Sequence, residues 1–425
     1  MKSAYFFVSV FTVLTFLRPQ EFLSWIKFPL LSILMALALA GYLGVKDKNL
    51  STPIHKYIFS FFIVVVISCT LNNPSLAFDR IWKFLLNIIL PTVLLSNVLT
   101  SIDRQKRLMF WLVLTGGFIA HHSIGQYYSP DHLGWTGLEA MWRTDKKLWQ
   151  VLWYGIMADP NDLGQFFLVL VPFTIYLFGQ ATSILIKLIL LTNFGLIMVG
   201  IFLTNSRGTL LGLLIVTGYW FFRKYGVFKT AVAVLVASPG ILIIASSGGE
   251  ISAEDESANQ RLDAWIQGYF MFRDNILFGV GALGGFAENH NKTAHNTLVL
   301  TYAETGILGY FMWTFMLFAT WLWLYKLSAG QSFSDANLNL NKKIEKERVL
   351  ADTLLYSLLG FLISAFFLSR SYTMILFMLV GYTMAQIVRF EKLIPGYKFE
   401  FKWYLFAPIT VASVVIITVV SFKMR

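Results

Sequence analysis

Apolar stretches about as long as a membrane helix recur along this chain, with short polar segments between them. A helix needs about 20 apolar residues to cross the hydrocarbon core of a bilayer, and most stretches here reach or approach that length. They are rich in Leu, Ile, Val and Phe and do not alternate strictly with polar residues, so they favour helices over the strands of a membrane barrel. About 12–13 transmembrane helices are predicted, in the segments Ser3–Leu17, Phe28–Val45, Tyr57–Leu71, Phe84–Leu99, Leu108–Tyr127, Leu163–Phe178, Ile184–Thr204, Leu210–Phe222, Ala231–Ala245, Ile307–Tyr325, Leu354–Leu368, Tyr372–Val388 and Tyr404–Phe422.

The composition supports this interpretation. Of the 425 residues, 56% are hydrophobic and only 13% are charged, which excludes an ordinary soluble globular protein. We therefore predict an all-α polytopic membrane protein that forms a single integral membrane domain over residues 1–425. The apolar sequence directly after Lys2 lacks a convincing cleavage site and is interpreted as the first helix, not as a removed signal peptide.

The formal charge of +11 is interpreted as a signal of orientation. Lys and Arg accumulate in the cytoplasmic loops of membrane proteins. With Lys2 inside, all the dense basic clusters fall on the cytoplasmic side, which includes a polar cytoplasmic loop at residues 327–350. No nucleic-acid partner is needed to explain the charge. The only cysteine, Cys69, lies in an apolar run and is expected to be a small buried residue without a disulfide.

Two long loops are predicted on the opposite, periplasmic side. The first, residues 128–162, contains four tryptophans and ends in the turn-like Asp159-Pro160-Asn161-Asp162. Its tryptophans, Trp135, Trp142, Trp149 and Trp153, form either an aromatic belt at the membrane interface or a platform for a sugar or lipid.

The main periplasmic loop is predicted at residues 246–294. It opens with an acidic, flexible piece, and apolar residues then recur at helical spacing between Arg261 and Phe270, which predicts a short amphipathic helix on the membrane surface. A glycine-rich turn at 278–286 follows. Its glycines formally match the spacing of a dinucleotide-binding loop, but no parallel sheet surrounds them, so a close backbone approach or a tight turn is expected instead.

Several arginines lie at the predicted ends of membrane helices, near the boundary between lipid and water. Arg207 lies in a polar break of about six residues between two apolar segments, where an uncompensated charge is costly. It either pairs with a carboxylate or receives an anionic ligand, for which its planar fork suits phosphate oxygens. The carboxylates considered for such a pair are Asp159, Asp162 and Glu304.

Three further arginines lie at predicted outward positions. Arg261 and Arg273 flank the predicted surface helix, where each binds either an anionic ligand or lipid headgroups. Arg370 occupies the minimal turn Ser369-Arg370-Ser371 between two apolar segments.

His295 and Asn296 lie where the main periplasmic loop gives way to an apolar helix. An imidazole titrates near neutral pH and can take a proton from a hydroxyl, while nearby arginines neutralise a phosphate leaving group. Taken alone, His295 is better explained as a histidine that satisfies the helix terminus, and the nearby arginines are what favour the catalytic interpretation. His290 is the weaker candidate. No Cys/His cluster has zinc spacing, so neither a metal site nor a cofactor is expected.

An ordered set of motifs resembles the bacterial O-antigen ligase and O-antigen polymerase superfamily. The motifs cover roughly residues 155–325, and the Arg18-Pro19-Gln20-Glu21 opening is similar to that of members associated with exopolysaccharide or exosortase loci. In chain order they are Asp159-Pro160-Asn161-Asp162, Ser206-Arg207-Gly208, Arg261 with Trp265, Phe278-Gly279-Val280-Gly281, His295-Asn296 and Glu304-Thr305-Gly306.

The resemblance implies a type C glycosyltransferase fold of around twelve helices, with its active site at the periplasmic face of the bacterial inner membrane. It implies an undecaprenyl-diphosphate-linked glycan as donor, a lipid A core, glycan or protein acceptor, and no metal or nucleotide sugar. His295 matches the essential histidine of the family, and Arg207 and Arg261 match its two diphosphate-handling arginines. Supporting roles are expected for Asp159, Asn161, Trp265, Asn296, Glu304 and Arg370.

The resulting hypothesis is an inverting, metal-independent transfer of a glycan to an acceptor hydroxyl, with His295 as the base. Two alternatives stay open. The first is a polymerase of the same superfamily that joins O-antigen or exopolysaccharide repeat units. The second is a transporter or flippase for lipid-linked glycans, which would place ionisable residues near the bilayer midplane.

Overall fold

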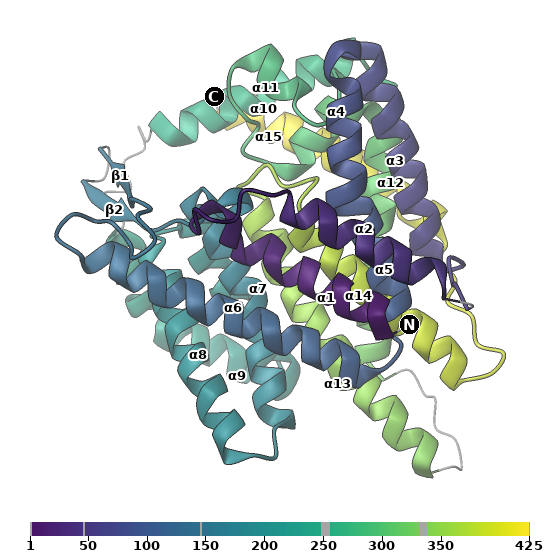
Figure 1. The fold of residues 1–425 in the computed structure, drawn as a ribbon. Helices are drawn as coiled ribbons and strands as arrows, with labels where there is room; N and C mark the ends of the chain where they lie inside the picture. Colours follow the sequence, from purple (N-terminus) through teal and green to yellow (C-terminus); the bar gives the residue numbers. More distant parts are fainter. Residues whose placement is uncertain (1, 46, 145–146, 248–255, 331–337, 425) are drawn as a thin grey trace.

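The computed structural model describes residues 2–45, 47–144, 147–247, 256–330 and 338–424 (Figure 1). The predicted acidic piece of the main periplasmic loop falls largely on residues 248–255, outside the described residues. The α-helices of the described part are α1 Lys2–Leu17, α2 Leu30–Leu43, α3 Pro53–Asn72, α4 Pro74–Phe84, α5 Leu90–Val98, α6 Ile102–Tyr128, α7 Pro160–Gln180, α8 Ile184–Leu203, α9 Arg207–Ser247, α10 Glu256–Asp274, α11 Gly285–His290, α12 Thr297–Ser328, α13 Leu338–Ala365, α14 Met374–Leu393 and α15 Ala407–Met424.

Other regular structure is sparse. The π-helical segment Leu85–Ile89 joins α4 to α5, and three short 3-10 turns lie at Pro19–Glu21, Gly155–Met157 and Trp403–Leu405. Two antiparallel strands, β1 Met141–Arg143 and β2 Leu148–Gln150, form a small hairpin beyond the end of α6 (Figure 1).

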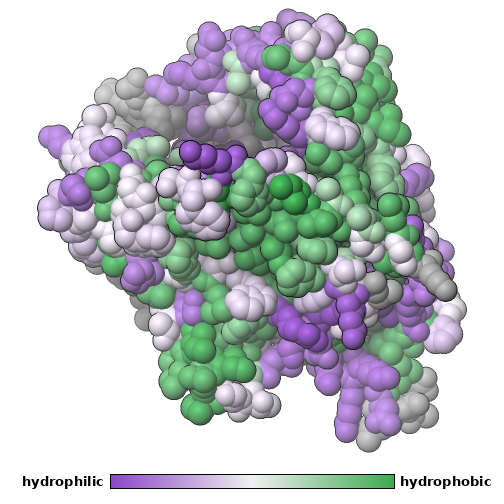
Figure 2. All heavy atoms as spheres, in the orientation of Figure 1, coloured by the Kyte–Doolittle hydropathy of each residue, from purple (hydrophilic) through white to green (hydrophobic). Residues whose placement is uncertain are grey.

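The predicted class, an all-α polytopic membrane protein, is confirmed. Within the described residues, nine helical segments are long and apolar enough to cross a membrane, and α1 and α2 are shorter apolar helices. Figure 2 shows apolar side chains over much of this face, with polar ones gathered towards the top and bottom of the view. This distribution is typical of a protein that is solvated by lipid along its sides and by water at its ends.

Each predicted span overlaps a helix, but two spans differ in kind. The predicted segments at 210–222 and 231–245 are halves of α9, which leaves helical geometry at Gly226 with φ 81° and ψ 177°. The predicted span that begins at Ile307 is only the second part of α12, whose helical geometry breaks at Gly306. Only glycine adopts such backbone conformations without strain. The hydropathy pattern contains no information on this conformational freedom, so it does not predict either break.

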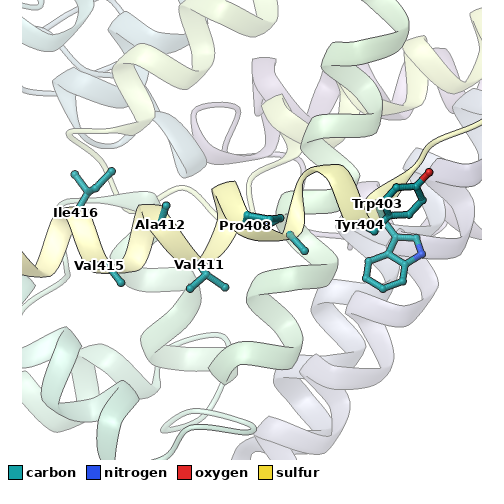
Figure 3. A pocket seen from close by; sticks show the side chains of 8 residues that line it. Trp403, Tyr404, Pro408, Val411, Ala412, Val415 and Ile416 are labelled. Atoms are coloured by element: carbon teal, nitrogen blue, oxygen red, sulfur yellow. The ribbon is translucent and has the colours of Figure 1, made fainter.

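The core is formed around α7 and α14. Within their apolar windows, 94% of the α14 residues and 83% of the α7 residues are buried, against 28% for α8 and 22% for α15. The exposed face of α15 forms an apolar hollow lined by Val411, Val415 and Ile416, with Trp403 at one end (Figure 3). Such a surface is suited to contact with lipid chains. Helices α7 and α14 thus form the centre of the bundle, and α8 and α15 lie at its periphery.

Candidate active site around the 366–373 loop

The loop at residues 366–373, between α13 and α14, is fastened to the first turn of α12. The Thr297 hydroxyl hydrogen-bonds to the Leu368 carbonyl at 2.6 Å and accepts a bond from the Arg370 backbone N–H at 3.0 Å. The Ser371 hydroxyl donates to the Thr297 carbonyl at 3.1 Å. These bonds make the loop and the start of α12 a single unit.

His295 lies at this junction. Its backbone N–H donates to the Ser369 hydroxyl at 2.9 Å, and its backbone is left-handed, with φ 49°. Asn296 follows as the N-cap of α12, because its side-chain oxygen accepts bonds from the N–H groups of Leu298 at 2.9 Å and Val299 at 3.1 Å. The imidazole is therefore held just before a capped membrane helix.

Several charges act on this imidazole. Burial lowers the pKa of His295 most, because burial disfavours the charged form. The positive charge of Arg261 lowers this pKa further, whereas the Asp159 carboxylate raises it. Arg370 and Lys292 also lower it, with smaller effects. Charged residues from four separate segments thus affect the pKa of this one imidazole.

Arg261 reaches the site from α10. One helical turn further along, the Trp265 ring packs edge-on against Phe366 at 5.7 Å between centroids. Helix α10 packs against α12 and α15, and its Tyr269 ring contacts Phe422. The helix predicted after Arg261 is thus present and lies against the 366–373 loop.

Arg207 begins α9 beside the same loop. The Ser206 hydroxyl donates to the Asn161 side-chain oxygen at 2.7 Å, and Asn161 donates from its backbone and side chain to Asp159 at 2.8 and 2.9 Å. A Cβ atom on Gly208 would lie 3.4 Å from the Phe367 ring. The turn before α7 therefore holds the turn that carries Arg207, and the 366–373 loop lies beside it.

The sequence did not reveal the pairing of Arg370. Its guanidinium binds both carboxylate oxygens of Asp162, whose side chain is 4% exposed, while that of Arg370 is 33% exposed. Asp162 had been considered only as a partner for Arg207. The two residues are 208 positions apart, and only the positions of both in tight turns at the same end of the bundle could have suggested the contact.

Glu304 lies in α12, and its side chain interacts with Tyr372 of the 366–373 loop. Its buried carboxylate accepts bonds from the backbone N–H groups of Leu283 at 3.2 Å and of Gly284 and Phe286 at 3.1 Å. The carboxylate thus fixes the glycine-rich turn and is not among the charges that act on His295. These bonds give Glu304 a part in the structure of the turn, and its expected support of the site stays a prediction.

The glycine-rich turn completes the broken α12. Because α12 leaves helical geometry at Gly306, the Ala303 carbonyl is free to accept from the Val280 N–H at 2.9 Å, and the Ile307 N–H donates to the Ile276 carbonyl at 2.7 Å. A Cβ atom on Gly279 would collide with the α12 backbone. The close backbone approach expected for this turn is therefore present.

The surface of the molecule is hollowed in two places. Figure 2 shows one on the face of the molecule, below the region of α10 and α11, with polar side chains around it. A groove of about 520 Å³ lies between α12, α13 and α15. Its wall includes Thr297, Leu298 and Phe366 and is otherwise mostly apolar and aromatic. Within the described residues, no cluster of three or more His, Cys, Asp or Glu side chains could hold a metal ion.

The fold and the site together define a polytopic helical membrane protein with a cluster of arginine and histidine at one end of the bundle. Residues 192–314 match the family model Wzy_C, described as O-antigen ligase, which confirms the resemblance to the O-antigen ligase and polymerase superfamily. The matched region runs from α8 into α12 and contains Arg207, Arg261 and His295. The comparison with curated proteins gave no match.

Proposed function

We propose that this protein is an O-antigen ligase-like glycosyltransferase, which moves a glycan from undecaprenyl diphosphate to an acceptor hydroxyl. The observation that supports the proposal is that His295 and the residues next to Arg207 and Arg261 all lie against the 366–373 loop, at Ser369, Phe367 and Phe366 respectively. The match to the O-antigen ligase family supports the same class of reaction. We further propose that the site faces the periplasm from the bacterial inner membrane.

His295 acts as the general base. The acceptor O–H proton moves to the imidazole, the acceptor oxygen forms a bond to the anomeric carbon, and the bond from that carbon to the diphosphate oxygen breaks with its electron pair. Attack from the face opposite the leaving group inverts the anomeric centre. Because its pKa is lowered, His295 is neutral near pH 7 and ready to accept the proton.

Arg207 and Arg261 bind the diphosphate. A guanidinium offers parallel N–H donors that match phosphate oxygens, and its charge offsets the charge that develops on the departing group. Both arginines lie on helices that contact the 366–373 loop through neighbouring residues, Gly208 and Trp265. Their placement at one end of the bundle suits a headgroup at a membrane surface.

The groove between α12, α13 and α15 suits the polyprenyl chain of the donor. It begins at Thr297 and Leu298, directly after the His295–Asn296 pair, and its lining is largely apolar. A lipid tail in the groove would leave the diphosphate beside the arginines. On the opposite side, the β1–β2 hairpin is tied to the Arg207 turn, since the Gln150 side chain donates to the Thr204 carbonyl at 2.9 Å. Its tryptophans suit the sugar rings of donor or acceptor.

The deciding experiment is transfer by purified protein in vesicles that contain a lipid-linked glycan donor. His295→Ala should lower the rate of product formation by about 10² to 10⁴, while donor binding and thermal stability stay near wild type. In the wild type, the rate should fall as pH drops through the lowered pKa of His295. His290→Ala is the matched control, because it removes an imidazole from α11 at the same end, and it should keep its activity. Full activity of His295→Ala would refute the assignment.

The acceptor distinguishes the two functions of the superfamily. Supplying the donor alone tests polymerisation of repeat units, and adding lipid A core or a protein acceptor tests ligation. The transporter alternative predicts movement of labelled lipid-linked glycan across vesicles without any new glycosidic bond. The gathering of the candidate charges at helix ends favours chemistry at the surface over transport through the midplane.

A further inference from the structure

One loop contacts the neighbours of all three proposed functional residues. Within residues 366–373, Phe366 contacts Trp265, Phe367 lies against Gly208, and the Ser369 hydroxyl binds the His295 backbone. The position of this loop therefore determines how the base and the two arginines face one another. Whatever holds the loop in place also sets the geometry of the reaction.

We propose that Asp162 and Arg370 form a positioning pair for glycan transfer, in which the buried carboxylate fixes Arg370 and, through the 366–373 loop, the His295 imidazole. This inference rests on the proposed function. Asp162 then serves to hold Arg370 in place. Arg370 acts by positioning the base, His295, and not by binding the substrate.

The geometry of the pair supports a fixed orientation. The Arg370 guanidinium binds Asp162 through two nitrogens and two oxygens, and such a bidentate contact sets direction as well as distance. Asp162 lies in the first turn of α7, where the helix dipole favours a negative charge. Since its side chain is 4% exposed, the carboxylate requires a partner to remain charged.

Helix α7 is a suitable anchor. It belongs to the buried core of the bundle, and the same first turn carries Asn161, which binds Ser206 next to Arg207. One turn of one rigid helix thus makes two ties, to the loop beside His295 and to the turn that carries Arg207. The pair thus helps to fix the position of His295 relative to Arg207.

The pair also controls the charge that the imidazole faces. The charged groups that act on His295 are Arg261, Asp159, Arg370 and Lys292. Asp162 compensates the charge of Arg370. Without that carboxylate, the full positive charge of Arg370 would disfavour the protonated imidazole more strongly; without Arg370, protonation would become easier.

The test compares the pH dependence of kcat/KM in Asp162→Asn and Arg370→Gln. Both variants should lower kcat at least tenfold with little change in the KM for the donor. The acid limb of the profile should move to lower pH in Asp162→Asn and to higher pH in Arg370→Gln. NMR titration of the His295 imidazole should show the same opposite shifts without depending on turnover.

The chain offers a matched control at the other end of the bundle. Arg223 on α9 binds Asp352 on α13 at 2.5 Å. Asp352→Asn removes another Arg–Asp pair between helices, although Asp352 is more exposed than Asp162, 34% against 4%. It should lower stability while leaving the acid limb and the His295 titration unchanged. A purely structural role for Asp162 would make the two Asp→Asn variants alike.

Identical acid limbs in Asp162→Asn, Arg370→Gln and wild type would overturn the proposal. If Asp162→Asn does not fold, Arg370→Lys replaces it: the charge remains and the bidentate contact is lost, so kcat should fall while the acid limb stays in place. An unchanged kcat in that variant would also overturn the proposal. His295→Ala in the same assay separates the two hypotheses. Full activity of His295→Ala refutes the proposed function. If His295→Ala is inactive but the acid limbs of Asp162→Asn and Arg370→Gln do not shift, only the positioning role is refuted.

Discussion

The Asn296 side chain has one polar atom that caps a helix and one that has no partner. Its oxygen caps α12, but its amide nitrogen is buried and has no hydrogen-bond partner among the described residues. A buried donor left without a partner costs about 1–3 kcal/mol. Next to His295, such a donor is well placed for an oxygen of the donor glycan or its diphosphate.

Asn296→Ser separates the two roles. Serine caps a helix about as well as asparagine, so the thermal stability should change little. The lost amide donor should lower kcat/KM for the lipid-linked donor by roughly tenfold, the equivalent of about 1.4 kcal/mol. Ser101, which caps α6 by accepting from the Arg104 N–H, provides the control: Ser101→Ala should lower stability and leave transfer unchanged. Unchanged transfer in Asn296→Ser would show that the amide serves the fold alone.

The limits of the sequence differ from residue to residue. A histidine at a helix start and arginines at membrane ends stand out locally, because charge and imidazole are conspicuous in an apolar chain. The Asp162–Arg370 pair joins residues 208 positions apart, so no local pattern signals it. The sequence also does not reveal the backbone amides that bind the Glu304 carboxylate, because the turn that presents them depends on a conformation that hydropathy does not encode.

Helix positions were largely predictable, since apolar length determines which segments can span a bilayer. The breaks within α9 and α12 were not, because they depend on single glycines and on partners far along the chain. At Gly306 the break frees backbone groups that the 276–280 segment then satisfies. The start of α12 at Thr297 agrees with the apolar helix predicted after Asn296, although the transmembrane span was predicted only from Ile307.

Gly306→Ala tests the α12 break. The φ of 63° strains any residue with a Cβ, and the added atom would meet the backbone at Leu277 and Phe278. The expected loss of stability is about 1–3 kcal/mol, measured by thermal unfolding in detergent. Gly218, a helical glycine in α9 with open space around it, is the control: Gly218→Ala should be neutral or slightly stabilising, by up to about 1 kcal/mol. If the two variants change the thermal stability equally, α12 does not need a glycine at position 306.

The two ends of the bundle differ in chemistry. One end carries the candidate site, with the β1–β2 hairpin, α10 and α11 around it. The other carries ion pairs that tie helices together, such as Arg389 with Glu347 at 2.8 Å, and the basic segments predicted to be cytoplasmic. Arg389 and Glu347 are 8% and 5% exposed, and losing one partner of such a buried pair costs about 3–5 kcal/mol. Ion pairs between segments therefore occur at both ends, since Asp162–Arg370 lies at the site end, but the proposed chemistry belongs to one end only.

This polarity predicts the orientation in the membrane. Cys69 is the only cysteine and is 1% exposed, so a thiol reagent that cannot cross membranes should leave the wild type unlabelled. Ala287→Cys, on exposed α11, should react in intact spheroplasts if the site faces the periplasm. Ala329→Cys, exposed just after α12, should react only after permeabilisation because the basic segments lie inside. The reverse pattern would place the arginine and histidine cluster in the cytoplasm, where an acceptor at the periplasmic surface could not reach it.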